Sequence, residues 1–180
     1  MPIAAAGMPK IATVYWLIPA EPERELFREL IRILAKHFDA PRFEPHLTLL
    51  VTGEDRQAPK QILEQIDASL IQLRLLEISF SSKFTKTLFV RFKSKNALKK
   101  LIVDLRRVTK SRGQLVRDPH VSLLYKKIPV ALKKELVSMM RLPFKEVVFD
   151  SIKAVRCHLP VRDRADVKSW RVIAAKSLAR

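Results

Sequence analysis

The sequence has few glycines, one cysteine and a small share of acidic residues. Its 180 residues include three glycines, so neither a glycine-rich P-loop nor the dinucleotide fingerprint G-x-G-x-x-G can be formed. The one cysteine, Cys157, excludes a disulfide framework and a zinc cluster of several thiolates. The longest apolar stretch, Ile11–Ala20, is about half of the roughly 20 residues that a bilayer span needs. Because the chain has no glycine-rich loop that could bind phosphate through backbone amides, any phosphate bound here must be held by side chains.

Positive charge is the most prominent feature of the composition. There are 35 Lys and Arg residues against 18 Asp and Glu, a formal net charge of +17, while 48% of the residues are hydrophobic. This apolar fraction is sufficient for a packed core, so the charge does not indicate a disordered basic tail. It favours anionic partners such as nucleotides, nucleic acid or phosphorylated metabolites, although a basic surface without such a partner is the alternative.

The first residues lack the positive start and apolar segment of a signal peptide. We therefore expect a soluble cytoplasmic protein with no membrane association, a monomer of one domain over residues 1–180, with a flexible N-terminus over residues 1–9. No linker rich in glycine, serine or proline divides the chain.

Hydrophobic periodicity predicts strands and helices in an order that favours an α+β fold. Several neighbouring strands have no helix between them, which is typical of mostly antiparallel sheet. The basic stretch Lys93–Arg112 is interpreted as a solvated helix face, with phosphate contact as the second reading. The predicted strands are Ile11–Ile18, Phe43–Val51, Leu73–Phe80, Thr87–Lys93, His120–Tyr125, Val147–His158 and Trp170–Ser177; the helices are Glu21–Phe38, Ala58–Leu70, Asn96–Lys110 and Val130–Arg141; Pro160–Lys168 is a charged loop.

One short pattern occurs twice, as Pro-His-Leu-Thr-Leu-Leu at residues 45–50 and Pro-His-Val-Ser-Leu-Leu at residues 119–124. In a strand, residues two apart share a face, so His46 lies beside Thr48 and His120 beside Ser122. The opposite face is aliphatic and packs on the core. The polar face must line a cleft, because unpartnered buried imidazoles and hydroxyls would be costly.

Two imidazoles and two hydroxyls suit chemistry at a phosphodiester. One neutral imidazole can take a proton from attacking water while the other, protonated, gives one to the departing ribose oxygen. The hydroxyls can donate to nonbridging phosphate oxygens, and no metal or cofactor is required.

The alternatives explain the repeated pattern less well. A single Pro-His-x-Thr is usually a packed histidine, but two copies in the same aliphatic frame are not expected by accident. His37 and His158 have no hydroxyl two residues later. A zinc site that includes Cys157 and His158 is a poor alternative, because adjacent strand residues point to opposite faces.

The two motifs resemble those of the 2H phosphoesterase superfamily, which is defined by paired His-x-Thr/Ser sequences. The chain is most similar to the plant and yeast cyclic nucleotide phosphodiesterase branch, which acts on ADP-ribose cyclic phosphate. That branch carries Pro-Arg-Phe-x-Pro-His, present here at residues 41–46, and Pro-His-x-Ser-Leu-Leu-Tyr, present at residues 119–125. Weaker matches are an opening strand that ends Trp-Leu-Ile-Pro at residues 16–19 and a closing strand that begins at Trp170.

The resemblance implies a bilobal α+β fold of two pseudo-symmetric, mostly antiparallel sheets with outer helices around a central groove. It implies metal-independent hydrolysis of nucleoside 2′,3′-cyclic phosphates or ADP-ribose 1″,2″-cyclic phosphate, to the 2′-phospho or 1″-phospho product. RNA ends are an alternative substrate, and a nucleotide- or RNA-binding module without turnover is a third possibility. The charge of +17 is more than a mononucleotide needs and would help to bind an oligonucleotide end.

The resemblance also implies roles for individual residues. His46 and His120 would be the catalytic pair, Thr48 and Ser122 would hold the phosphate, and Tyr125 would contribute to the phosphate site. Strict alternation places Tyr125 opposite Ser122, so this role requires a twist or bulge near the end of the strand. Trp16 could stack on a base or belong to the core. A loop that contains Phe84 and Lys86 could overhang the site.

Overall fold

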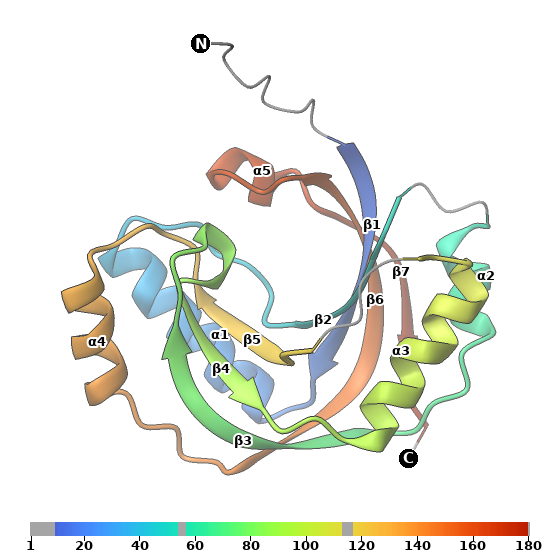
Figure 1. Cartoon of the computed structure of the whole chain (residues 1–180), viewed down its shortest axis with the longest axis horizontal. Coiled ribbons are helices and arrows are strands. Elements are labelled where there is room, and N and C mark those ends of the chain that lie inside the picture. The colour runs from blue at the N-terminus through green and yellow to red at the C-terminus, as the bar shows by residue number, and fades with distance from the viewer. Residues whose placement is uncertain (1–9, 54–56, 113–116, 180) are drawn as a thin grey trace.

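The computed structural model describes residues 10–53, 57–112 and 117–179, so the predicted flexible segment 1–9 lies outside the described residues. Within these ranges, seven strands form one antiparallel sheet, and five α-helices surround it (Figure 1). The predicted α+β class is therefore confirmed. The strands are β1 (Lys10–Pro19), β2 (Leu47–Thr52), β3 (Ile71–Phe80), β4 (Leu88–Phe92), β5 (His120–Leu124), β6 (Glu146–Leu159) and β7 (Arg171–Ser177); the helices are α1 (Glu23–His37), α2 (Pro59–Glu64), α3 (Asn96–Thr109), α4 (Val130–Met139) and α5 (Arg164–Lys168), with a 3₁₀ turn η1 (Phe84–Lys86).

The sheet curves back on itself because β6 is long enough to pair at both of its ends. The strand order is β1-β2-β5-β4-β3-β6-β7, and β6 also pairs with β1. The first residues of β6 pair with β3, and the remainder pairs with β1 and β7. Strands β2 and β5 pair only at Leu47 and Val121. The strands that carry the two histidine motifs are thus neighbours where the two halves of the sheet meet.

Helices connect the two halves of the sheet. Helix α1 follows β1 in sequence but packs mainly against β5, while α3 follows β4 but packs against β2. Helix α2 lies on β7 and α4 on β3. The aliphatic side chains of β2 and β5 and those of α1 and α3 therefore belong to one continuous hydrophobic core.

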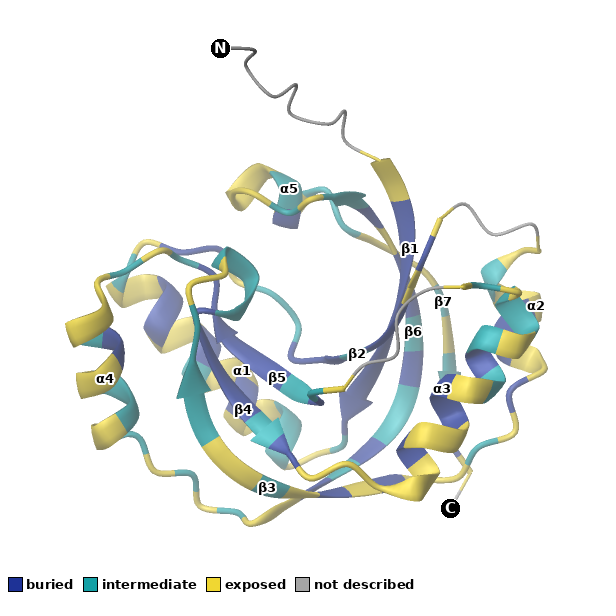
Figure 2. Cartoon of the chain, viewed as in Figure 1, coloured by how far each residue is buried: buried dark blue, intermediate teal, exposed yellow. Residues whose placement is uncertain are grey.

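Strand β1 is buried on both faces, as the dark blue of most of its length shows in Figure 2. Tyr15 and Leu17 belong to the large core, whereas Val14 and Trp16 pack in a smaller cluster that includes Cys157 of β6. This second cluster supports the side of the sheet on which the polar motif residues lie.

Three predicted elements were wrong in part. The strand predicted over Phe43–Val51 begins only at Leu47, so His46 lies just before β2. Helix α2 ends at Glu64 rather than Leu70, because the chain turns to pair with the C-terminus, where the Leu70 amide donates to the Ala179 carbonyl at 2.8 Å. The segment predicted as a charged loop contains α5. The Asp163 carboxylate caps this helix by accepting a hydrogen bond from the Asp166 amide at 3.0 Å. No helix in the described ranges is long and apolar enough to span a membrane.

Candidate active site

The structure brings the residues of both motifs together around one cavity of about 330 Å³. The cavity lies where β2 and β5 approach each other, and residues of β1 and β6 complete its wall. All six residues that the sequence singled out line it: Trp16, His46, Thr48, His120, Ser122 and Tyr125.

Each motif strand carries a β-bulge at the residue that follows its hydroxyl. Along β1, Tyr15 pairs with Leu50 but Trp16 pairs with Thr48, which leaves Leu49 as the extra residue of β2. Along β4, Leu88 pairs with Leu124 but Phe89 pairs with Ser122, which leaves Leu123 as the extra residue of β5. Both extra leucines are fully buried.

The bulges explain how Tyr125 reaches the cavity. An extra residue shifts the alternation of the strand by one position, so the residue five places after each histidine returns to the side of that histidine. These residues are Tyr125 in one motif and Val51 in the other, and both line the cavity. The bulge that the role of Tyr125 required is therefore present. The position five residues after the histidine is polar in one motif (Tyr125) and aliphatic in the other (Val51).

The two histidines are held in the same way. The imidazole Nδ1 of His46 lies 2.6 Å from the Glu44 carbonyl oxygen, and that of His120 lies 2.8 Å from the Asp118 carbonyl oxygen. A carbonyl oxygen can only accept a hydrogen bond, so Nδ1 must carry the proton in both rings. In the neutral form each Nε2 is then an acceptor that is able to take a proton.

Aromatic side chains fix the planes of both imidazoles. Trp16 stacks on His46 with a centroid distance of 3.8 Å and an interplanar angle of 14°. Phe89, on the strand that pairs with β5, packs edge to face with His120 at a centroid distance of 5.3 Å. Trp16 is only 4% exposed, and Trp170 packs against it edge-on. The Trp16 ring thus supports His46 in this structure. Its burial agrees with the reading of Trp16 as a core side chain, and stacking on a base stays a prediction.

Burial favours the neutral form of both imidazoles. It lowers the pKa of His46 to about 4, and the carbonyl and carboxylate of Glu44 offset only part of this effect. Burial also lowers the pKa of His120, with the Asp118 carbonyl acting in the opposite direction and Lys86 adding to the decrease. A bound anion would favour the protonated form of either ring.

The two motif hydroxyls differ in their hydrogen bonds. The Ser122 hydroxyl donates to the Thr85 carbonyl at 2.8 Å. Burial raises the pKa of the Tyr125 phenol, and the nearby Ser122 hydroxyl offsets part of this effect. The Thr48 hydroxyl has no hydrogen-bond partner among the residues that the structure describes. Thr48 can therefore donate to a ligand directly, whereas the Ser122 hydroxyl is tied to the loop before β4.

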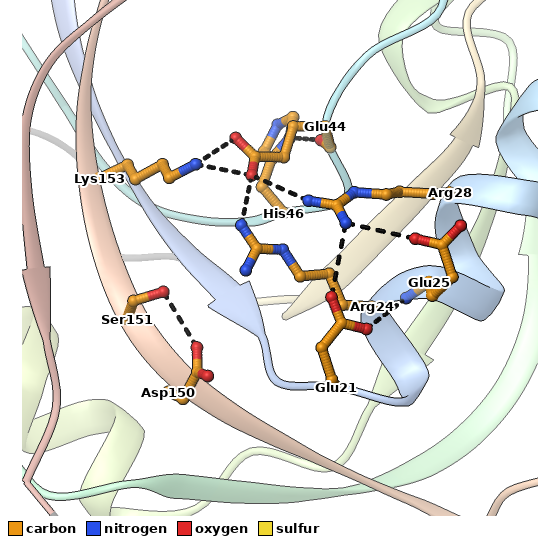
Figure 3. Close-up of polar contacts among 9 residues, drawn as sticks. All are labelled: Glu21, Arg24, Glu25, Arg28, Glu44, His46, Asp150, Ser151 and Lys153. Atoms are coloured by element: carbon orange, nitrogen blue, oxygen red, sulfur yellow. Dashed lines mark hydrogen bonds and ion pairs between the residues drawn. The ribbon is translucent and has the colours of Figure 1, made fainter.

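An acidic residue stands two positions before each histidine, and cationic side chains hold each carboxylate; Glu44 has three, of which Arg28 is the most distant at 4.0 Å. Figure 3 shows Glu44 between Lys153 and Arg24, with Nζ···Oε1 and Nη2···Oε1 distances of 2.6 and 2.8 Å. Asp118 forms ion pairs with Lys86 and with Arg91, the latter at 2.9 Å. Burial opposes ionisation of both carboxyls, but their cationic partners outweigh it and hold each pKa below its ordinary value.

Sequence reasoning missed part of the cavity wall. Lys86 was considered only as part of an overhanging loop, but its pairing with Asp118 and its position 4.3 Å from the Phe89 ring centroid fix its ammonium beside the cavity. The Phe43 ring stacks on the Tyr125 ring with a centroid distance of 3.8 Å and an interplanar angle of 11°. The acidic residue two positions before each histidine was a readable signal, since both motifs carry it.

Cys157 also lines the cavity, where burial raises the pKa of its thiol to about 12. It is therefore a neutral part of the wall at ordinary pH. His158 lies apart from the cavity lining, with Nδ1 3.5 Å from the Ser169 hydroxyl. Across the described ranges, no three His, Cys, Asp or Glu side chains are grouped closely enough to hold a metal ion.

Comparisons with known proteins agree with this architecture. Residues 11–178 match the family described as cyclic phosphodiesterase-like protein. This chain therefore belongs to the cyclic phosphodiesterase-like family, within the 2H phosphoesterases. No curated protein sequence matches the chain.

Solved structures with the same fold share little sequence with this chain. E. coli LigT complexed with 3′-AMP has a TM-score of 0.56 and 17% identity, over 94% of this chain and 99% of LigT. LigT complexed with ATP has a TM-score of 0.58 and 15% identity, over 96% and 99%. The protein TT0787 of Thermus thermophilus has a TM-score of 0.58 and 18% identity, over 93% and 97%. At these identities, the likeness shows the fold.

Proposed function

We propose that this protein is a metal-independent cyclic phosphodiesterase. Its substrate would be a nucleoside 2′,3′-cyclic phosphate or ADP-ribose 1″,2″-cyclic phosphate, opened to the 2′-phospho or 1″-phospho product. One observation carries the proposal: two imidazoles with the same Nδ1 tether face one cavity, each followed two residues later by a hydroxyl on the same side. The LigT complex with 3′-AMP is consistent with a ribonucleotide ligand for this fold.

The chemistry needs two proton transfers, and the histidine pair can perform both. A water oxygen attacks phosphorus while one neutral Nε2 takes its proton. The bond from phosphorus to the departing ribose oxygen breaks, and the protonated Nε2 of the other histidine gives that oxygen a proton. One imidazole ends protonated and the other neutral, so a proton exchange with solvent restores the starting state. His46 and His120 fill these two roles in an order that depends on how the ring of the substrate lies.

The side chains around the histidines would hold the phosphate. Thr48 donates from its hydroxyl, and Lys86 places positive charge beside the nonbridging oxygens. Tyr125 can donate its phenol proton to a phosphate oxygen. Donors held in place before the reaction stabilise the developing negative charge without reorganising, which is the role of an oxyanion hole.

The proposal is tested by following the reaction in EDTA. Purified protein is incubated with cytidine 2′,3′-cyclic phosphate in ¹⁸O-labelled water, and products are identified by ³¹P NMR and mass spectrometry. We expect a 2′-phosphate that contains one labelled oxygen, formed at the same rate with and without chelator. Absence of turnover on this substrate and on ADP-ribose 1″,2″-cyclic phosphate would overturn the proposal.

A further inference from the structure

The cavity with the two histidines opens into a second, larger groove of about 1190 Å³. The cavity and this groove share a set of lining residues, so they form one continuous hollow. The groove extends past the first residues of β1 on one side and the turn before β4 on the other. The shared residues are Val51, Lys83, Thr85, Leu159 and Val161.

Basic side chains from four separate segments line this groove. Lys10 begins β1, Lys83 precedes η1, Lys127 follows β5, and Arg162 follows β6. We call these four residues and the groove that they line the basic groove. None of the described residues that line it is acidic, and all four basic residues are exposed. The groove therefore attracts anions along its length.

Most of this charge is not neutralised by the described part of the protein. Arg162 has a carboxylate neighbour, with its Nε 3.6 Å from Asp166. Lys10, Lys83 and Lys127 have no carboxylate within ion-pair distance among the described residues. The cations at the two histidines differ in this respect, since Lys86 and Lys153 are paired with Asp118 and Glu44.

The basic groove also has an aromatic side chain where it meets the cavity. Phe84 of η1 lines the groove and is only partly buried. Its ring lies 6.1 Å from Tyr125, which lines the histidine cavity. An accessible ring next to a row of cations is the combination by which proteins bind single-stranded nucleic acid, through base stacking and phosphate contacts.

We propose that the basic groove binds the nucleotides that precede a terminal 2′,3′-cyclic phosphate, so that the preferred substrate is a single-stranded oligoribonucleotide. This inference rests on the proposed cyclic phosphodiesterase activity. The terminal nucleotide occupies the cavity of about 330 Å³, and the preceding backbone runs along the basic groove with a base on Phe84. A mononucleotide would leave the larger groove and its four cations without a ligand.

The test compares two substrates that carry the same reacting group. Cytidine 2′,3′-cyclic phosphate and an eight-residue RNA with a 2′,3′-cyclic end are assayed for kcat/KM between 50 and 300 mM salt. We expect the oligonucleotide to be preferred at least about 10-fold at low salt. Its log kcat/KM should fall with log salt at a slope of about −0.7 for each phosphate contacted, and the mononucleotide should show little salt dependence.

Variants locate the effect in the basic groove. Lys10→Ala, Lys127→Ala and Arg162→Ala are combined, because these three residues line only the larger groove. Each lost contact should lower kcat/KM for the oligonucleotide by roughly 1.5- to 5-fold, as expected for an exposed ion pair. In the triple variant, kcat/KM for the oligonucleotide should also depend much less on the salt concentration. Hydrolysis of the mononucleotide should stay unchanged.

A matched control removes the same charge elsewhere. Lys93→Ala, Lys95→Ala and Lys99→Ala lie before and within the start of α3, and all three residues are exposed and line neither hollow. This triple variant should keep the oligonucleotide preference.

The outcomes separate the two proposals. Equal kcat/KM for both substrates, or equal losses in the two triple variants, would overturn the basic groove while leaving the proposed activity intact. Failure to cut either substrate would overturn the activity. In that case, the affinity for the same RNA would be measured by fluorescence anisotropy. The basic groove predicts weaker RNA binding by the groove triple variant than by the control triple variant, and equal affinities would overturn it.

Discussion

The partly buried carboxylate of Glu44 offers a quantitative test of how the first histidine is held. The side chains of Glu44, Arg24 and Lys153 are each about one-fifth exposed, so their ion pairs lie between the exposed and the buried limits. Glu44→Gln removes the charge but keeps the backbone carbonyl that accepts the His46 Nδ1 proton. It leaves Arg24, Lys153 and the more distant Arg28 without the anion that they share.

We expect Glu44→Gln to lower the free energy of unfolding by about 1–3 kcal/mol. This range lies between the stabilisation by an exposed ion pair and the loss of stability when one partner of a buried ion pair is removed. Urea denaturation followed by circular dichroism measures this loss. In the double variant Glu44→Gln/Lys153→Met, one unpaired cation is gone, so the combined loss should be smaller than the sum by about 1 kcal/mol. Glu77→Gln is the control, because Glu77 forms a similar 2.7 Å pair with Arg91 but is 52% exposed, and it should cost less than about 1 kcal/mol.

The same variant should also change the histidine. The Glu44 carboxylate favours the protonated form of His46, so removing it should lower the pKa of His46 further, as measured by NMR titration of the ring. An unchanged pKa, together with additive losses in the double-mutant cycle, would refute the reasoning that this carboxylate acts on His46.

Four further predictions concern single side chains of the cavity. Burial holds the pKa of His46 at about 4, below its ordinary value of 6.5, so protonation of His46 favours the unfolded chain. The free energy of unfolding should therefore fall by up to about 3 kcal/mol as the pH drops from about 7 to 4. In urea titrations His46→Gln should flatten this fall, and an equally steep fall in the variant would contradict the prediction. Thr48→Val should reduce kcat/KM by about 10- to 100-fold with little change in Tm, because it removes a donor to a charged phosphate. Ser122→Ala should instead destabilise the protein by about 0.5–1.5 kcal/mol, because the Thr85 carbonyl loses its hydrogen-bond donor. Tyr125→Phe should lower kcat/KM while leaving the unfolding midpoint within a few degrees, and the opposite pattern would assign Tyr125 to packing alone.

Much of the fold follows from local patterns in the sequence. The alternation of aliphatic and polar residues in the two motifs predicted strands β2 and β5 and the side to which their histidines point. The spacing of leucines predicted α3, and its observed end at Thr109 is one residue before the predicted end. These features depend on the periodicity of a single segment, which sequence reasoning can measure directly.

The features that depend on distant parts of the chain could not be read in this way. The end of α2 is set by pairing with Ala179, and the ring of strands depends on β6 reaching both halves of the sheet. The placement of the bulges at Leu49 and Leu123 depends on the register with β1 and β4. Only the need for a bulge near Tyr125 was predictable, because alternation alone would place this residue on the wrong side.

The candidate site was predictable where the residues repeat and not where they differ. The sequence paired each histidine with a hydroxyl, but the Thr85 carbonyl that engages Ser122 is 37 residues away in the chain. The ring of Trp16 was predicted near the site, but its stack on His46 depends on the pairing of β1 with β2. Lys86 reaches the cavity because Asp118 holds it, a contact between residues 32 positions apart.

The most direct test of the proposed mechanism is the kcat/KM of His46→Ala and His120→Ala on a 2′,3′-cyclic phosphate in EDTA, with circular dichroism to show that both variants are folded. If the two imidazoles act as the acid and base of one reaction, each substitution should lower kcat/KM by about 10²–10⁴-fold, and the bell-shaped pH profile should lose one of its limbs in each variant. Near-normal turnover in either folded variant would contradict the paired-histidine mechanism.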